Sequence, residues 1–223
     1  LRDGGIRRVL AEPETLAGLW WRDDDGQVQQ APPRLPTADL DTLPAPLRDG
    51  LVWPDHIQPA FYQAMITLRG SPYKCIYCAV PNLDERRTRY RSPSHVVDEI
   101  AELKRRWQIP YLFFHDSVFT LHKQRTLEIC RLMVARGLQV PFCIQTRADR
   151  LDAELLDALL AAGLHQVFFG IESGDADSLR RIRKATPLAQ IRHAVALTRA
   201  AGVRTSGFFM VGWPWEDAAL MTK

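Results

Sequence analysis

From about residue 61 the chain alternates between short apolar runs and amphipathic segments. The apolar runs are rich in β-branched and aromatic residues, as buried strands are, and they read "FYQAMITL", "YLFFH", "VPFCIQT", "HQVFFGI" and "VRTSGFFMVG". Between them, apolar positions recur at helical spacing. Strands that alternate with helices through short connections predict an α/β fold with a parallel sheet. The periodicity fits both an open doubly wound sheet and a partial (βα) barrel.

Residue types at the ends of the amphipathic segments indicate where the helices begin and end. Short polar side chains that can cap a helix stand at three predicted starts: Ser92, Asp152 and Thr186. Pro93 and Pro187 follow two of these caps, where proline suits the first turn. Glycine, which readily takes a left-handed conformation, stands just past three predicted ends: Gly137, Gly163 and Gly202.

The first 60 residues follow a different pattern. "LAGLWWRDDDGQVQQ" predicts a hairpin that turns at Asp25-Gly26. The next stretch, "APPRLPTADLDTLPAPLRDG", is rich in proline and aspartate and has no sustained period, which is typical of a linker or a clasp on a neighbouring surface. We therefore expect a hairpin and linker over residues 1–60 and an α/β core over residues 61–223.

Composition excludes several classes of protein. The 223 residues can bury a substantial core, and a net charge of +3 with scattered Lys and Arg offers no nucleic-acid surface. No apolar run is long enough to span a membrane, and no signal-peptide pattern opens the chain. We expect a cytoplasmic protein whose cysteines are thiols or ligands: Cys75, Cys78, Cys130 and Cys143. The missing initiator Met and a helical pattern that stops at residue 223 are typical of a fragment.

A polar cluster follows each predicted strand. These clusters are "GSPYKCIYC", "HDS", "QTRAD", "GIESGD" and "GFFMVGWPWED". Because the carboxyl ends of parallel strands meet at one edge, we expect the clusters to surround one mouth. The CxxC pair in the first cluster can hold a metal from one short loop. Taken alone, the pair also fits a structural zinc site or two free thiols.

From about residue 39 to its end, the chain resembles radical S-adenosylmethionine enzymes, most closely the class that carries an amino-terminal cobalamin-binding domain. The resemblance lies in motifs in the family's order: "DLDTLPAP", "RGSPYKCIYC", "GIESG" and "GFFMVGWP". The family hallmark is CxxxCxxC, and here Ser71 stands at the position of the first cysteine. The resemblance implies a truncated, partial (βα) TIM-like barrel of the radical SAM type. It makes residues 1–60 the link to a cobalamin-binding domain outside this chain.

The resemblance also implies cofactors and the residues that hold them. Three thiolates of the loop hold a [4Fe-4S] cluster, whose open iron binds S-adenosylmethionine and whose electron cleaves it to a 5′-deoxyadenosyl radical. On this chain the cluster positions are Cys75, Cys78 and Ser71. The positions near S-adenosylmethionine are Tyr77, Glu172, Ser173, Gly212 and Pro214. Trp215 departs from the glycine common after that proline, and cobalamin is implied only for the full-length parent.

The predicted function is therefore that of a radical SAM enzyme domain, with methyl transfer as a candidate reaction. The implied partners are a small-molecule or natural-product substrate and an electron donor such as flavodoxin or ferredoxin. Two alternatives stay open: a cluster-deficient barrel that serves as a binding or scaffold domain, and a zinc-binding α/β protein. The choice between the enzyme and these alternatives depends on Ser71, because a serine oxygen is harder and shorter in reach than the soft thiolates that hold iron.

Several other side chains have both a functional and a structural interpretation. Arg147 is a candidate partner for the cofactor carboxylate, because arginine pairs with carboxylates in a bidentate way, and it equally fits a strand end. His115 fits either substrate binding or a hydrogen-bonded strand end. Cys130 is expected in the core, and Cys143 either in the core or facing the barrel. We expect one mouth to gather Ser71, Cys75, Cys78, Asp116, Arg147, Glu172 and Gly212.

Overall fold

The structure is a computed structural model that describes residues 11–48, 64–84 and 86–221. It divides into two compact units, Leu1–Ala38 and Asp39–Lys223, and each is described by itself. The first unit contains one turn of 3-10 helix, η1 (Pro13–Thr15), and two strands, β1 (Trp20–Arg22) and β2 (Val28–Gln30). The strands pair antiparallel around a turn in which Gly26 has a φ of 77°, so the predicted hairpin is confirmed.

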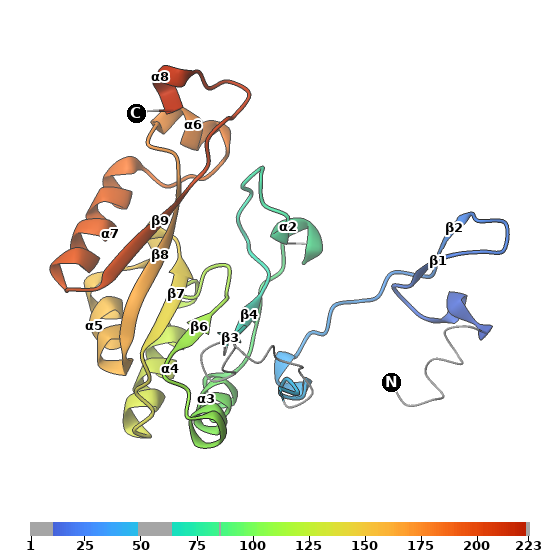
Figure 1. Ribbon diagram of the computed structural model, residues 1–223, viewed down its shortest axis with the longest axis horizontal. Helices are drawn as coiled ribbons and strands as arrows, with labels where there is room; N and C mark the ends of the chain where they lie inside the picture. Colours follow the sequence, from blue (N-terminus) through green and yellow to red (C-terminus); the bar gives the residue numbers. More distant parts are fainter. Residues whose placement is uncertain (1–10, 49–63, 85, 222–223) are drawn as a thin grey trace, which may run out of the picture. The chain divides into compact units, whose positions relative to one another are not determined.

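The second unit is built on a five-stranded parallel sheet in the order β3-β6-β7-β8-β9 (Figure 1). Its strands are β3 (Ala64–Met65), β6 (Leu112–Phe114), β7 (Phe142–Thr146), β8 (Leu164–Glu172) and β9 (Arg204–Phe209). A doubly wound sheet reverses its strand order at a switch point, whereas the described strands follow one another in chain order. Right-handed crossovers then return on the same side each time, which is the geometry of a barrel.

The helices along one side of the sheet are α3 (Pro93–Trp107), α4 (Lys123–Ala135), α5 (Ala153–Ala162) and α7 (Leu188–Ala200) (Figure 1). The short helices α2 (Val80–Leu83), α6 (Ala176–Arg181) and α8 (Ala218–Met221) and the 3-10 turns η2 (Leu40–Thr42) and η4 (Ala148–Arg150) do not belong to this layer. A separate antiparallel pair consists of β4 (Leu68–Arg69) and β5 (Arg89–Tyr90). Within the described ranges, no helix is long and apolar enough to cross a membrane.

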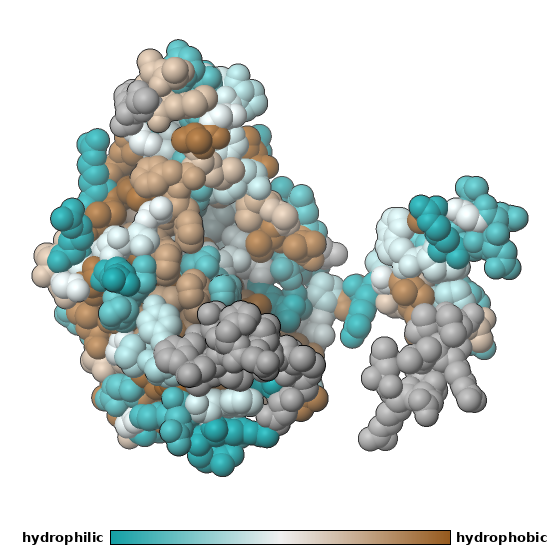
Figure 2. Space-filling model, viewed as in Figure 1, coloured by the Kyte–Doolittle hydropathy of each residue, from teal (hydrophilic) through white to brown (hydrophobic). Residues whose placement is uncertain are grey.

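Apolar side chains remain exposed where β9 ends. Phe208, Phe209, Met210 and Val211 are each more than a third exposed, and brown and tan surface gathers over this part of the unit in Figure 2. β9 is the last strand of the described sheet and pairs with β8 alone, so one edge of the sheet is open.

Two of the three predicted helix caps are confirmed. The Ser92 hydroxyl accepts a hydrogen bond from the backbone N–H of His95 at 3.2 Å. The Asp152 carboxylate accepts one from the N–H of Leu155 at 2.9 Å. The prediction for Thr186 is wrong: Pro187 is the capping residue and makes no side-chain cap bond. The Thr186 hydroxyl accepts instead from Arg147 at 2.6 Å, so a tertiary contact outcompetes the local cap.

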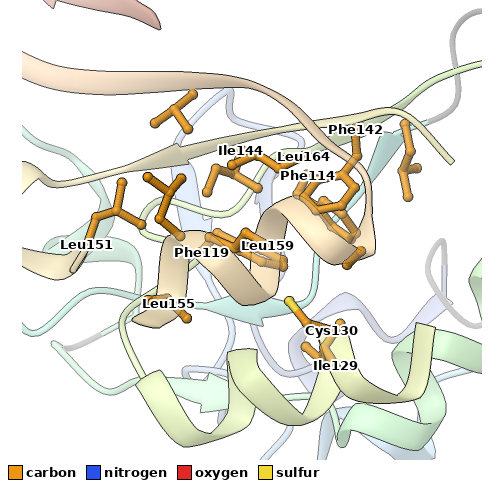
Figure 3. Close-up of a cluster of buried hydrophobic side chains, with 14 of the residues drawn as sticks. Phe114, Phe119, Ile129, Cys130, Phe142, Ile144, Leu151, Leu155, Leu159 and Leu164 are labelled. Atoms are coloured by element: carbon orange, nitrogen blue, oxygen red, sulfur yellow. The ribbon is translucent and has the colours of Figure 1, made fainter. Parts of the chain in front are cut away.

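The core lies between the sheet and its helices (Figure 3). Strand side chains such as Phe114, Phe142 and Ile144 meet helix side chains such as Ile129 and Leu159, and all are nearly inaccessible to solvent. Cys130 is 2% exposed among them, and burial raises the pKa of its thiol to about 12. Its predicted core position is confirmed.

The described end of the linker fastens to α3. The Asp41 carboxylate accepts from the N–H of Ser92 at 2.9 Å and lies 2.8 Å from Nδ1 of His95. Farther along, the Arg48 guanidinium forms a 2.6 Å ion pair with Glu99 in the middle of α3. Residues 39–48 of the proline-rich segment are therefore a clasp within the second unit.

Asp116 anchors the backbone between β3 and β4. One carboxylate oxygen accepts from the N–H groups of Thr67 (2.6 Å) and Leu68 (2.9 Å), and the other accepts from the Thr67 hydroxyl (2.6 Å). Burial raises the pKa of Asp116, and these hydrogen bonds oppose that shift. All three donors point at the carboxylate, so the ionised form is the one that this pocket satisfies.

We expect Asp116→Asn to destabilise the protein by about 1–3 kcal/mol, because the amide nitrogen replaces an acceptor and faces a buried donor. Equilibrium denaturation at neutral pH measures the free energy of unfolding. The matched control is Asp157→Asn, an exposed aspartate on α5, which should be close to neutral. Equal stability of the two variants would show that Asp116 does not anchor this segment.

Candidate functional site

The cysteine loop after β4 starts at a position that requires glycine. Gly70 has a φ of 91°, and a Cβ there would lie 1.8 Å from the carbonyl oxygen of Arg87. The loop then turns so that the N–H of Cys78 donates to the carbonyl of Cys75 at 3.2 Å. It docks through the N–H of Ile76, which donates to the carbonyl of Ile182 at 3.1 Å. The loop is thus held against the segment after α6.

A cavity of about 260 Å³ lies between this loop and the carboxyl ends of the sheet strands. Its described lining comes from six regions of the chain: Ser71, Tyr73, Cys75, Tyr77, Cys78, Val80, Pro81, Ser117, Val118, Gln145, Thr146, Arg147, Phe168, Gly170, Glu172, Lys184 and Phe208. The fold therefore brings together both loop cysteines, Ser71, Tyr77, Arg147 and Glu172 as predicted by their places at strand ends.

A buried ion pair stands in this cavity. Nζ of Lys184 lies 3.0 Å from Oε1 of Glu172, and the two side chains are 6% and 9% exposed. The sheet is shaped to hold them: β8 has a β-bulge between Gly170 and Glu172, a device that re-aims a side chain. A Cβ on Gly170 would lie 2.7 Å from the Lys184 nitrogen and 2.8 Å from the Glu172 oxygen. Glycine at this position leaves room for the pair.

Backbone strain gathers around the same pair. Glu172 has a φ of 70°, and Arg183 and Ala185, which flank Lys184, have φ values of 57° and 55°. Non-glycine residues take this left-handed region at a cost, and such residues cluster at functional sites. Sequence analysis missed Lys184, because "RRIRK" resembles a solvated basic helix end and no spacing sets this lysine apart.

Arg147 is buried and mostly committed to the protein. Its guanidinium pairs with Asp149 at 2.9 Å and donates to the Lys184 carbonyl at 2.8 Å and to the Thr186 hydroxyl at 2.6 Å. The group also lies 3.8 Å from the ring centroid of Tyr73, on the cysteine loop. One nitrogen, NH1, is buried without a hydrogen-bond partner among the described residues. An unpaired buried donor is costly, so this nitrogen is suited to an acceptor on a bound molecule.

Tyr77 closes another side of the cavity. Its hydroxyl lies 3.5 Å from Nζ of Lys184, and its ring packs 5.8 Å from that of Trp213. Burial, followed by the nearby Glu172 carboxyl and Cys75 thiol, raises the pKa of the Tyr77 hydroxyl. The hydroxyl therefore stays protonated and can donate a hydrogen bond.

Four predicted site residues do not line this cavity. The Ser173 hydroxyl is buried and accepts from the N–H of Asp175 at 3.1 Å. Gly212, at a φ of 87°, donates its N–H to Glu216 in the turn that also contains Pro214. Asp116 is buried beneath the cysteine loop, where it holds Thr67 and Leu68. These residues lie outside the cavity lining.

The donor set matches only part of a cluster site. Cys75 and Cys78 are half-buried thiols at the cavity wall, and Ser71 is a buried hydroxyl on the same loop. In the described ranges, no group of three or more His, Cys, Asp or Glu side chains could hold a metal ion. Two soft ligands and the unpaired Arg147 nitrogen fit a cluster with a cofactor that bears a carboxylate, whereas Ser71 leaves one cluster position without a thiolate.

A parallel sheet in chain order, with a cysteine loop at its carboxyl edge, defines a partial barrel built around a cofactor site. The family model of the radical SAM superfamily matches residues 65–221. The chain belongs to the radical SAM superfamily. This confirms the predicted family.

Curated relatives extend the similarity to the first unit. An uncharacterized methyltransferase from Pyrococcus horikoshii is 28% identical over 206 residues, which cover 92% of this chain and 45% of the relative. An anaerobic magnesium-protoporphyrin IX monomethyl ester cyclase from Rubrivivax gelatinosus is 30% identical over 221 residues, which cover 97% of this chain and 40% of the relative. The chain thus spans less than half the length of these relatives.

Solved structures confirm the fold. The cobalamin-dependent S-adenosylmethionine radical enzyme OxsB, with aqua-cobalamin and S-adenosylmethionine bound, matches with a TM-score of 0.75 at 20% identity, covering 98% of this chain and 33% of that chain. The radical S-adenosylmethionine methyltransferase TsrM from Kitasatospora setae, with cobalamin and a [4Fe-4S] cluster bound, matches with a TM-score of 0.65 at 23% identity, covering 71% and 32%. The predicted partial barrel is therefore correct.

We expect Lys184→Met to lower the free energy of unfolding by about 3–5 kcal/mol, because Glu172 is left as a buried, unpaired charge. Adding Glu172→Gln to that variant should recover much of the loss, since the uncompensated charge is removed. Chemical denaturation of the two single variants and the double variant measures this coupling. Lys123→Met, which removes an exposed lysine paired with Asp152 and Glu154, is the control and should cost far less. Additive effects of the two substitutions would contradict the pairing.

Proposed function

We propose that residues 61–223 form the radical-generating core of a radical SAM enzyme, and that residues 1–60 link this core to a cobalamin-binding domain of the whole protein. The observation that carries the proposal is a shared cavity, in which the cysteine-loop side chains face the strand-end charges. These residues are Ser71, Cys75, Cys78, Arg147, Glu172 and Lys184. The cluster would be held by Cys75 and Cys78, with the third position at Ser71.

The charged residues divide the recognition of S-adenosylmethionine between them. NH1 of Arg147 and the ammonium group of Lys184 are the donors that suit the carboxylate of the cofactor. Glu172 is an acceptor, which suits the amino group or ribose hydroxyls, and Tyr77 shields the same wall. When bound, the cluster supplies the electron that cleaves the sulfonium to a 5′-deoxyadenosyl radical. The protein orients the cofactor and excludes water around it.

The relatives favour methyl transfer as the reaction of the whole protein, because several of them are named methyltransferases. A small-molecule or natural-product substrate, an electron donor such as flavodoxin or ferredoxin, and cobalamin in the parent complete the proposal. A cluster-deficient scaffold is the alternative that Ser71 raises, and restoring the thiol tests it directly.

We expect the chain as it stands to assemble its cluster incompletely, and Ser71→Cys to restore a stable cluster and cofactor cleavage. A serine hydroxyl resists deprotonation and is a hard ligand, whereas these clusters are held by soft thiolates. Both forms are reconstituted anaerobically with iron and sulfide. Iron content and visible absorption are then measured, followed by 5′-deoxyadenosine after dithionite is added.

The control for that experiment is Ser117→Cys, which adds a thiol to the same cavity outside the loop. Recovery by this variant would mean that a third thiol anywhere in the cavity suffices. If the unsubstituted chain equals Ser71→Cys in iron and turnover, Ser71 is a competent ligand. If neither form holds iron, the proposed activity is wrong and the scaffold alternative stands.

In the reconstituted Ser71→Cys protein, we expect Glu172→Gln to weaken S-adenosylmethionine binding roughly ten- to a hundredfold, the effect of losing a charged hydrogen bond. Gln keeps the shape of the side chain and leaves an acceptor for Lys184. Calorimetry measures affinity, and iron analysis checks that the cluster is unchanged. Glu128→Gln, on α4 and outside the cavity lining, is the control, and its side chain is 41% exposed. An unchanged affinity for S-adenosylmethionine would show that Glu172 does not contact the cofactor.

A further inference from the structure

A second cavity of about 300 Å³ lies beside the cofactor cavity in the second unit. The clasp forms one wall, which is apolar and includes Leu43 and Pro44. Met65 and Ile66, from β3 and the residue after it, form the opposite wall. Nothing in the cofactor chemistry proposed above uses this cavity. Its volume suits a small molecule of a few rings.

The polar end of this second cavity is cationic. Arg48 and Arg91 share the buried carboxylate of Glu99, each at 2.6 Å. A third guanidinium, that of Arg69, lines the same cavity, is exposed, and has no ion pair within the described part of the chain. Three positive groups therefore face one negative group. An acidic group on a ligand complements this end, since arginine binds carboxylates in a bidentate way.

Aromatic rings connect the two cavities across the face of the sheet that the helices leave open. The ring of His115 stacks on Phe113 with centroids 4.1 Å apart and planes at 20°. Phe113 lies 5.6 Å from Phe168, and Phe168 lies 5.6 Å from Phe208. His115 lines the second cavity, whereas Phe168 and Phe208 line the cofactor cavity. In the second cavity, the His115 ring, backed by Phe113, can pack against another flat ring, stacked or edge to face.

The two cavities also adjoin along the backbone. Arg69 lines the second cavity and Ser71, two positions later, lines the cofactor cavity. After β6, His115 lines the second cavity and Ser117 lines the cofactor cavity. Residues that line the second cavity therefore stand two positions along the chain from residues that line the cofactor cavity. The aromatic row runs between the two cavities.

We propose that the second cavity binds the substrate of the proposed radical chemistry, and that this substrate is a flat aromatic or conjugated ring compound bearing a carboxylate. The inference rests on the proposed function, because the bound molecule is identified as the substrate of that radical chemistry. The His115 ring, backed by Phe113, and the apolar clasp select the ring, and the exposed Arg69 at the cationic end selects the carboxylate.

Calorimetry with a matched set of probes tests the proposal on the whole 223-residue chain, with and without the reconstituted cluster. The probes are 2-naphthoate, which is flat and anionic, 2-naphthalenemethanol, which is flat and neutral, and decahydro-2-naphthoate, which is anionic and not flat. We expect 2-naphthoate to bind at least about tenfold more tightly than either of the others, since each lacks one of the two matched contacts.

Substitutions locate the binding. Arg69→Gln and Phe113→Leu should each weaken 2-naphthoate binding about tenfold, by loss of the charge and of the ring that backs His115 respectively. Arg105→Gln, an exposed arginine on α3, and Phe209→Leu, an exposed phenylalanine on β9, are the matched controls and should leave affinity unchanged. Circular dichroism of every variant checks that folding is intact, and Arg69, which is exposed, carries the test if Phe113→Leu unfolds.

Equal binding of the three probes, or an affinity that Arg69→Gln leaves unchanged, overturns the proposal. Binding of aquacobalamin that weakens with Arg69→Gln would also overturn it, because the cavity would then contact a corrin. If the chain binds the probe without a cluster and never cleaves S-adenosylmethionine under any condition, that result refutes the proposed function and leaves the binding site in the second cavity standing. If the chain cleaves S-adenosylmethionine but binds no probe, the proposed substrate site is wrong and the proposed function stands.

Discussion

Every strand of the central sheet runs parallel to its neighbours and follows the previous strand in chain order, and this constraint organises the rest of the molecule. Each carboxyl end opens at the same edge, so loops that are far apart in sequence must meet there. The crossovers return along one face and cover it with helices, which leaves the other face for the cysteine loop and the aromatic row. Core packing and cofactor chemistry are thereby separated onto opposite sides of one sheet.

The mouth of the barrel concentrates charge that would be expensive to bury anywhere else. Lys184 and Glu172 neutralise each other, and Arg147 is neutralised by Asp149. Buried pairs of this kind add little net stability, because the cost of desolvating two charges offsets their attraction. Their value lies in position: fixed donors and acceptors face the cavity before any ligand arrives. The left-handed backbone conformations at Glu172 and beside Lys184 add a further cost to holding these groups in position.

Ser71 sets the cysteine loop apart from its surroundings. The features that shape the loop are intact, from Gly70, which lies close to the Arg87 carbonyl, to the contacts of the loop with Ile182 and Arg147. A loop freed from binding a cluster would have no chemical need for this geometry. The conflict is therefore confined to one side-chain atom, oxygen in place of sulfur, and the structure around it remains that of a cofactor site.

The sequence by itself determined the α/β class, the hairpin, the core position of Cys130 and the strand ends on which the site residues stand. These features follow from local periodicity, from turn residues such as Gly26, and from short-range caps such as Ser92 and Asp152. Tertiary structure decided that the sheet is a barrel and not doubly wound, since helical and strand periods are the same in both. It also withdrew Thr186 from its cap, placed Ser173 and Gly212 outside the cavity lining, and brought Lys184 to Glu172. Such contacts join residues whose separation in sequence carries no period, so only the folded chain can select them.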